Sequence, residues 1–393
     1  MDKQIIPVVF ATDENYVPYC GVAISSLIKN TSKSNKYEVS VLFDSLSSLS
    51  VYRLERLSTD NVSVSCLCIH EYIANLKALE YNHLTIASAY RLVIPDVFPQ
   101  YTKIIYLDSD IVVNADVAEL YNTDIGTNIL GAVRGYYKRD ETDFMYNHIT
   151  KTLGINENSF FNAGILIVNT KEFKQNNVAQ RCFDLLSERK DLYFMDQCAL
   201  NIVCESKVHM LPNRWNHEWL YLFAVNNPKL PRNREEFETC ASPAIIHYDG
   251  VEKPWDYPQQ FLADYFWSYA RQTPFYEEIV YSAQMRRTRE MLELFGVVGK
   301  YRNIAIYGAG SAGKRYVNKI LSLKLCKIAV WVDRNFAELQ GLELPVESVE
   351  KLYDTDFDHV FIAIENIAVS NQIKDMLIAN NIPNDKIIQI QKA

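Results

Sequence analysis

The strongest constraint on the fold is a regular alternation of two kinds of segment along the first 130 residues. Short apolar runs of strand length occupy 5–11, 37–44, 62–69 and 103–107, and helical segments separate them. Alternating strands and helices are typical of βαβ units, in which parallel strands form one sheet covered by helices. The sequence therefore predicts an α/β fold with a mostly parallel sheet.

The same alternation starts again near residue 301 of the 393-residue chain. Between the two regions, residues 213–270 are rich in Trp, Tyr, Pro and His, which is typical of long ordered loops. A domain usually holds about 100–200 residues. We therefore expect a larger α/β domain at 1–270, a helical linker at 271–300 and a small Rossmann-like domain at 301–393.

Composition narrows the classes of partner. The formal net charge of −8 disfavours non-specific binding of nucleic acid. The eight cysteines form no C-x-x-C pair, so reduced thiols and a cytoplasmic location are expected. No apolar run is long enough to span a membrane. Residues 284–302 mix Arg and Lys with apolar residues. They either contact the inner face of the membrane or form a linker helix with a solvated basic face. A homo-oligomer is left open.

Two carboxylates directly follow the apolar run at 103–107. Asp108 and Asp110 are two residues apart, so an extended chain places them on one face. Neighbouring carboxylates repel each other and are costly to bury, and a divalent cation would remove both problems. Ser109 is expected to point the other way and to keep the turn small. The alternative is that both acids are simply solvated where the strand ends.

A second acidic signal follows the first strand. Asp13 and Asn15 come just after the run at 5–11, and ligands bind at the carboxyl ends of strands in open α/β sheets. A carboxylate and an amide suit hydrogen bonding to a nucleobase or a ribose. The alternative is a turn or a helix N-cap, which both residue types favour.

A third signal lies far along the chain, where a short apolar run leads into His247. Gly250, Lys253 and Trp255 follow it. This spacing suggests an imidazole metal ligand followed by a phosphate-binding cation, although a single histidine after a strand is more often just hydrogen-bonded. Mixed carboxylate and imidazole ligation suits Mn²⁺ better than Mg²⁺, which prefers oxygen ligands.

Six motifs together resemble glycosyltransferase family 8 over about residues 1–265. In order they are FATDENY, YRLVIPDVFP, IIYLDSDIVV, FFNAGILIVN, MDQCALN and IIHYDGVEKPW. This retaining family contains bacterial lipooligosaccharide galactosyl- and glucosyltransferases and glycogenin. The resemblance implies a GT-A type fold. It also implies transfer of glucose or galactose from UDP-glucose or UDP-galactose to a hydroxyl of a glycan, glycolipid or glycoprotein.

The resemblance also implies roles for individual residues. Asp108, Asp110 and His247 match the family's Mn²⁺ ligands, with Mg²⁺ as a second choice. Asp196 and Gln197 match residues beside the reacting donor sugar, Gln197 on its β face. Glu14 departs from the pattern and is expected to point away from the site. The residues that match contacts to the nucleotide, the diphosphate or the donor sugar are Ala11, Asp13, Asn15, His83, Arg91, Asp108, Ser109, Asp110, Asn162, Gly250 and Lys253.

The chemistry of Gln197 bears on the mechanism. A retaining glycosidase uses a carboxylate as nucleophile at the anomeric carbon, whereas an amide is a poor nucleophile. We therefore expect front-face attack by the acceptor hydroxyl, with the amide oxygen stabilising positive charge; a double displacement is left open. The aromatic residues of 212–233, namely Trp215, Trp219, Tyr221 and Phe223, form either an acceptor platform or a hydrophobic cluster under a loop.

The C-terminal region carries a separate motif. Gly308, Gly310 and Gly313 form a G-x-G-x-x-G between a strand and a helix, and Asp333 ends the next strand. This pattern either binds a nucleotide or sugar nucleotide, or serves a tight turn, or supports docking. An oxidoreductase built on these glycines would leave the N-terminal motifs unexplained. A sugar-nucleotide sensor without turnover is the other alternative.

Overall fold

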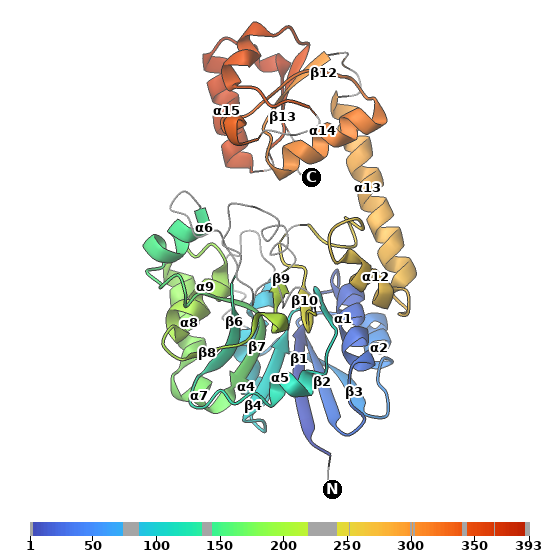
Figure 1. The fold of residues 1–393 in the computed structure, drawn as a ribbon, viewed down its shortest axis with the longest axis vertical. Coiled ribbons are helices and arrows are strands. Elements are labelled where there is room, and N and C mark those ends of the chain that lie inside the picture. Colours follow the sequence, from blue (N-terminus) through green and yellow to red (C-terminus); the bar gives the residue numbers. More distant parts are fainter. Residues whose placement is uncertain are drawn as a thin grey trace. The chain divides into compact units, whose positions relative to one another are not determined.

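The structure is a computed structural model, and it describes residues 3–73, 86–135, 144–218, 242–250, 252–298, 301, 303–339, 344–364 and 366–389. The chain divides into two compact units, residues 1–281 and 282–393, called here the first and second units (Figure 1). Helix α13 (Tyr276–Val298) begins in the first unit and ends in the second. It occupies most of the segment expected to be a helical linker.

The first unit is built on a seven-stranded sheet with the order β3-β2-β1-β4-β7-β6-β8. Every pairing is parallel except those of β7, which is antiparallel to both of its neighbours. The predicted α/β fold is confirmed, and the sheet is mixed. The strands are β1 (Ile5–Ala11), β2 (Lys36–Phe43), β3 (Val62–Cys68), β4 (Lys103–Leu107), β6 (Leu130–Arg134), β7 (Phe161–Asn169) and β8 (Val208–Met210).

Helices cover both faces of this sheet. Because strand side chains alternate, Ile6, Val8 and Phe10 of β1 join one buried cluster, and Val9 and Ala11 join another. The first cluster includes residues of α1 and α12, and the second includes residues of α8 and α9. Among the described residues, the α-helices that lie wholly in this unit are α1 (Val17–Lys29), α2 (Ser48–Glu55), α4 (Ile94–Val97), α5 (Val117–Tyr121), α6 (Phe144–Asn147), α7 (Thr170–Gln175), α8 (Val178–Glu188), α9 (Met195–Cys204) and α12 (Ala263–Ala270).

The helical segment before β4 is interrupted. It consists of a 3₁₀ helix, η1 (Ile86–Val93), followed by the short helix α4 (Ile94–Val97). Pro95 is the reason, because it has no N–H to donate to the preceding turn. It lies instead in the first turn of α4, where a missing N–H costs nothing.

A second, three-stranded sheet completes the first unit and positions the site. Its strands are β5 (Ile111–Val113), β10 (Ile245–His247) and β9 (His217–Glu218), in that order. Strand β10 runs antiparallel to β5 and parallel to β9. Only three residues, 108–110, separate β4 of the large sheet from β5 of the small one. The chain therefore passes from one sheet to the other through the two acids.

The second unit contains a four-stranded parallel sheet with the order β12-β11-β13-β14. Its strands are β11 (Asn303–Tyr307), β12 (Lys327–Val332), β13 (His359–Ile362) and β14 (Ile387–Gln389), and its long helices are α14 (Ser311–Leu323) and α15 (Ile367–Ala379). The glycine motif lies between β11 and α14. Within the part of the chain that the structure describes, no helix combines the length and apolar character needed to cross a bilayer.

Candidate active site

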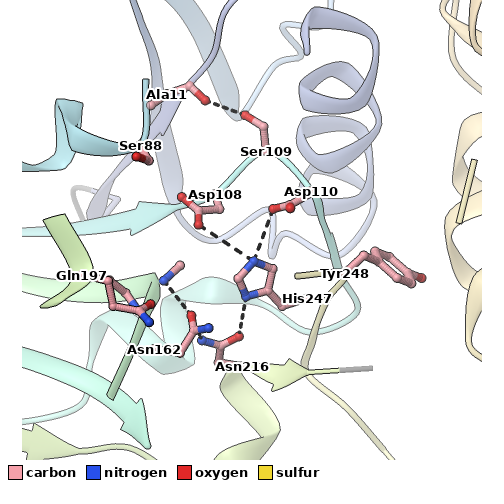
Figure 2. Close-up of polar contacts among 12 residues, drawn as sticks. Ala11, Ser88, Asp108, Ser109, Asp110, Asn162, Gln197, Asn216, His247 and Tyr248 are labelled. Carbon is pink, nitrogen blue, oxygen red and sulfur yellow. Dashed lines mark hydrogen bonds and ion pairs between the residues drawn. The ribbon is translucent and has the colours of Figure 1, made fainter. Parts of the chain in front are cut away.

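Strand pairing brings the histidine to the acids. In the β5–β10 ladder, His247 lies opposite Ile111, and the Tyr248 N–H donates to the Asp110 carbonyl oxygen at 3.0 Å. The His247 Nε2 atom lies 3.3 Å from Asp110 Oδ1 and 3.8 Å from Asp108 Oδ2. Figure 2 shows both carboxylates facing the same edge of the imidazole ring. Three side chains from two distant parts of the sequence therefore lie close together.

Gly164 of β7 makes room for this cluster. The Asp108 N–H donates to the Gly164 carbonyl oxygen at 2.8 Å, so the two backbones are in direct contact. A Cβ atom on Gly164 would lie 2.3 Å from His247 Cε1 and 2.9 Å from Asp108 Oδ2. No real Cβ tolerates such contacts, so only glycine fits here. Gly164 lies within the FFNAGILIVN motif, but the sequence alone indicates no role for it.

Lys253 adds a positive charge on the other side of Asp110. Its Nζ atom lies 2.6 Å from Asp110 Oδ2 and donates to the Tyr248 carbonyl oxygen at 2.6 Å. Burial by itself would raise the pKa of Asp110, but Lys253 and His247 together hold that pKa below its usual range. The loop that carries Lys253 is anchored by Trp255, whose ring stacks on Tyr19 with centroids 3.7 Å apart.

Asp108 faces a second buried cation, Arg91. The Arg91 side chain is 5% exposed, and one terminal nitrogen lies 3.4 Å from Asp108 Oδ1. The Arg91 Nε atom lies 3.0 Å from Asp196 Oδ2, and Asp196 is completely buried. Tyr106 also donates to Asp108, at 2.6 Å. Burial raises the pKa of Asp108, and Arg91 opposes that shift.

Three side-chain amides lie beside the acid–histidine cluster (Figure 2). The Gln197 Oε1 atom accepts a hydrogen bond from the Ala163 N–H at 2.8 Å. Asn162 Oδ1 accepts from Asn216 Nδ2 at 2.9 Å, and the other end of the Asn216 amide, Oδ1, lies 3.0 Å from His247 Nδ1. Asn216 was missed by sequence reasoning, because nothing local marks one polar residue in an aromatic-rich segment.

The donor set of this cluster suits a divalent cation. One oxygen of Asp108, one oxygen of Asp110 and one nitrogen of His247 all lie within 4.8 Å of one another. Two carboxylates and an imidazole are ligands that first-row divalent ions accept. In the described ranges, no other group of His, Cys, Asp and Glu side chains comes together in this way.

Comparison with known proteins identifies the family. The model of glycosyl transferase family 8 matches residues 7–259, which contain every site residue described above. The chain belongs to glycosyl transferase family 8. It is therefore a glycosyltransferase, and the resemblance of the six motifs is confirmed.

Individual similar proteins agree with this assignment. The chain is 27% identical to the lipopolysaccharide 1,2-glucosyltransferase of Escherichia coli over 280 residues, covering 67% of this chain and 78% of that protein. The structure of the bifunctional glycosyltransferase WbbM is 29% identical with a TM-score of 0.62, covering 72% of this chain and 52% of that one. The galactosyltransferase LgtC, whose structure was solved with donor and acceptor sugar analogues, has the same fold, with a TM-score of 0.57. The two chains are 22% identical, and the match covers 68% of this chain and 96% of that one.

The predicted nucleotide-binding residues near the N-terminus lie around β1. Ser109 donates from its Oγ atom to the Ala11 carbonyl oxygen at 2.7 Å, which ties the end of β1 to the acid turn. Asp13 Oδ1 accepts from the Tyr16 N–H at 3.0 Å, so one of its oxygens stabilises the turn before α1. Asn15 is exposed next to it.

Glu14 points away from the acids, as we expected from the resemblance to family 8. Its carboxylate accepts from the Ser47 N–H at 2.9 Å and from the Ser50 hydroxyl at 2.7 Å, so it binds the start of α2. Gly250 lies just after β10 with a φ of +76°, a left-handed conformation that favours glycine. His83 lies outside the described residues.

The aromatic segment is only partly described. Trp215 is buried in the same core cluster as the β1 and α1 side chains, which agrees with a hydrophobic cluster at this position. Trp219, Tyr221 and Phe223 lie outside the described residues, so the predicted acceptor platform stays a prediction.

Proposed function

We propose that this protein is a metal-dependent retaining glycosyltransferase that moves glucose or galactose from a UDP-sugar to a hydroxyl of a glycan, glycolipid or glycoprotein. The observation that carries the proposal is the cluster of the buried His247 and the half-buried Asp108 and Asp110, with Lys253 beside it. The similarity to the lipopolysaccharide 1,2-glucosyltransferase of Escherichia coli supports a hexose as the transferred group.

Asp108, Asp110 and His247 would hold Mn²⁺, with Mg²⁺ as the weaker candidate because of the nitrogen ligand. Bound there, the cation would neutralise the charge that develops on a departing diphosphate. Lys253 would add a fixed positive charge on the same side of the cluster, held in place by Asp110 and the Tyr248 carbonyl. Gly250, between His247 and Lys253, would let the backbone approach the phosphates.

Gln197 would lie at the donor sugar as the resemblance implies. Its Oε1 atom accepts from the Ala163 N–H, and because a carbonyl oxygen has two lone pairs, one remains to stabilise positive charge at the anomeric carbon. An amide held in this way is not a nucleophile, which favours front-face attack by the acceptor hydroxyl. Asp196 would act through Arg91, whose guanidinium it orients by a buried ion pair.

The nucleotide would lie along the end of β1, where Ala11, Asp13 and Asn15 meet the Ser109 turn. Asn162 would contact the donor sugar from the opposite side of the acid cluster. We further propose a cytoplasmic location, which the free state of all seven described cysteines supports.

Turnover of candidate donors tests the proposal. The full-length protein is incubated with a panel of UDP-sugars and Mn²⁺, and the released sugar is identified by mass spectrometry. We expect slow hydrolysis of one UDP-hexose, which stops when a chelator removes the cation and returns when Mn²⁺ is added back. Hydrolysis that continues unchanged in the chelator would remove the metal from the mechanism.

A further inference from the structure

A chain of hydrogen bonds beneath the acid cluster ends on His247. It runs from the Gly164 backbone N–H to Asn162 Oδ1 at 2.8 Å, from Asn162 Oδ1 to Asn216 Nδ2 at 2.9 Å, and from Asn216 Oδ1 to His247 Nδ1 at 3.0 Å (Figure 2). Asn162 is 8% exposed, and Asn216 and His247 are each 3% exposed. Water therefore has little access to these groups, and they must satisfy one another.

The first link fixes the direction of every later link. A backbone N–H can only donate, so the atom of Asn162 that faces Gly164 must be its carbonyl oxygen. That same oxygen faces Asn216, so Asn216 must present its NH₂ group there. The carbonyl oxygen of Asn216 then faces His247, because the amide has only two ends.

The last link therefore determines the histidine tautomer. A carbonyl oxygen can only accept, so His247 Nδ1 must carry the proton that it donates to Asn216 Oδ1. A neutral imidazole has one proton, which leaves the lone pair on Nε2. The Nε2 atom is the one that lies 3.3 Å from Asp110 Oδ1 and 3.8 Å from Asp108 Oδ2.

We propose that Asn216 is a positioning residue that holds His247 in the Nδ1–H tautomer, with the Nε2 lone pair directed at the cation site, and that the Gly164 N–H sets this arrangement through Asn162. The inference rests on the proposed metal-dependent function. A hydrogen-bonded partner of this kind fixes ring orientation as well as protonation in metal sites. Asn216 also links the predicted donor-sugar contact, Asn162, to the predicted metal ligand, His247, because its amide is hydrogen-bonded to both side chains.

Two substitutions at Asn216 separate hydrogen bonding from space filling. Asn216→Leu keeps a similar volume but removes both hydrogen bonds, whereas Asn216→Asp keeps an acceptor oxygen opposite Nδ1. We measure Mn²⁺ affinity on the protein alone, from the electron paramagnetic resonance signal of the free ion. Asn216→Leu should weaken Mn²⁺ binding by about 10- to 100-fold, and Asn216→Asp should keep affinity close to that of the wild type.

The matched control is Asn30→Leu. Asn30 is an amide of the same unit, and its nitrogen donates to the Ser26 and Val113 carbonyl oxygens and to the Tyr269 hydroxyl, none of which is a site group. It should bind Mn²⁺ as the wild type does. An Asn216→Leu variant that also binds Mn²⁺ as tightly as the wild type would overturn the inference, while loss of binding in His247→Ala would show that the proposed metal site still holds. Failure of the wild type itself to bind Mn²⁺ would instead overturn the proposed function, and this inference with it.

The tautomer can also be observed without substituting Asn216. Nitrogen-15 spectra of histidine-labelled protein, with His247 assigned from a His247→Gln variant, report which ring nitrogen carries a proton. We expect a protonated Nδ1 both in metal-free protein at alkaline pH and in protein loaded with Zn²⁺, a diamagnetic ion that accepts imidazole. A ring protonated only on Nε2 would overturn the inference even if the Leu variant fails to fold.

Discussion

Both units place a carboxylate close to the end of a sheet strand, but the two carboxylates have very different partners. In the first unit, Asp110 lies between β4 and β5 and faces His247 and Lys253, which come from a distant part of the chain. In the second unit, Asp333 follows β12, and its oxygens accept from the backbone N–H groups of Ala309 at 2.6 Å and Asn335 at 2.8 Å. The first carboxylate contacts charged side chains, and the second contacts only these backbone groups among its described hydrogen bonds.

The glycines of the second unit also serve local structure. A Cβ atom on Gly313 would lie 2.0 Å from the Gly308 carbonyl oxygen, so the helix start packs directly on the turn. That oxygen also accepts from Trp331 Nε1 at 2.8 Å, and Gly308 has a φ of +105°. These contacts give Gly308 and Gly313 a structural role, which both the tight-turn explanation and nucleotide binding require. A carboxylate at a strand end indicates chemistry when it faces charged side chains, and architecture when it accepts from backbone N–H groups.

The largest expected contrast is in catalysis. Asp110→Asn removes a proposed metal ligand and should lower donor turnover roughly 1,000-fold, in the range seen when one group that stabilises developing charge is lost. Asp333→Asn is the matched control, and its turnover should be unchanged. Both variants are compared with the wild type by the rate of UDP-hexose hydrolysis. Equal rates in all three proteins would mean that the contacts of Asp110 with His247 and Lys253 do not contribute to catalysis.

The next effect is on the stability of the first unit. Arg91→Met leaves the completely buried Asp196 and the half-buried Asp108 without their shared cation, so the free energy of unfolding should fall by about 3–5 kcal/mol. Arg189→Met breaks a partly exposed pair with Asp191 and should cost no more than about 1 kcal/mol. Urea unfolding followed by fluorescence measures both. Similar losses of unfolding free energy in the two variants would show that burial of the Arg91 ion pairs does not increase their contribution to stability.

A smaller effect is expected in the second unit. Gly313→Ala should destabilise that unit by about 1–3 kcal/mol, because the new methyl group meets backbone that cannot move aside. Gly310→Ala is the control, since a Cβ there meets nothing within 4 Å. Hydrogen exchange of the amides in β11 and β13 reports the local stability. Mn²⁺ binding should be unaffected by either change; a loss in Gly313→Ala would mean that the second unit contributes to the metal site.

The smallest expected effect is the loss of stability on substitution of Asp333. Asp333→Asn replaces one acceptor oxygen by an NH₂ group that faces a backbone N–H, so about 1 kcal/mol of stability should be lost from the second unit. The same hydrogen-exchange experiment measures it. No change at all would show that the carboxylate does not hold the glycine turn.

Much of the fold could be predicted from sequence because its signals are local. The apolar runs at 5–11 and 103–107 became β1 and β4 at the same residues. The two acids could be placed on one face because alternation along an extended chain is a property of the backbone.

The tertiary partners of the site could not be derived in this way. Arg91 and Asp196 were expected as separate ligand contacts, and nothing in either neighbourhood shows that they form a buried pair. Gly164 and Asn216 matter only because β10 brings His247 between them. Such contacts depend on how the chain crosses from one sheet to the other, which local sequence does not encode.

We infer above all that the acid–acid–imidazole cluster binds a sugar nucleotide through a cation. Calorimetric titration of the full-length protein with UDP, with and without Mn²⁺, and then with NAD(H), measures this binding. We expect heat from UDP only when Mn²⁺ is present, and none from NAD(H). Heat from NAD(H) with none from UDP and Mn²⁺ would contradict it, and would transfer ligand binding to the glycine turn of the second unit.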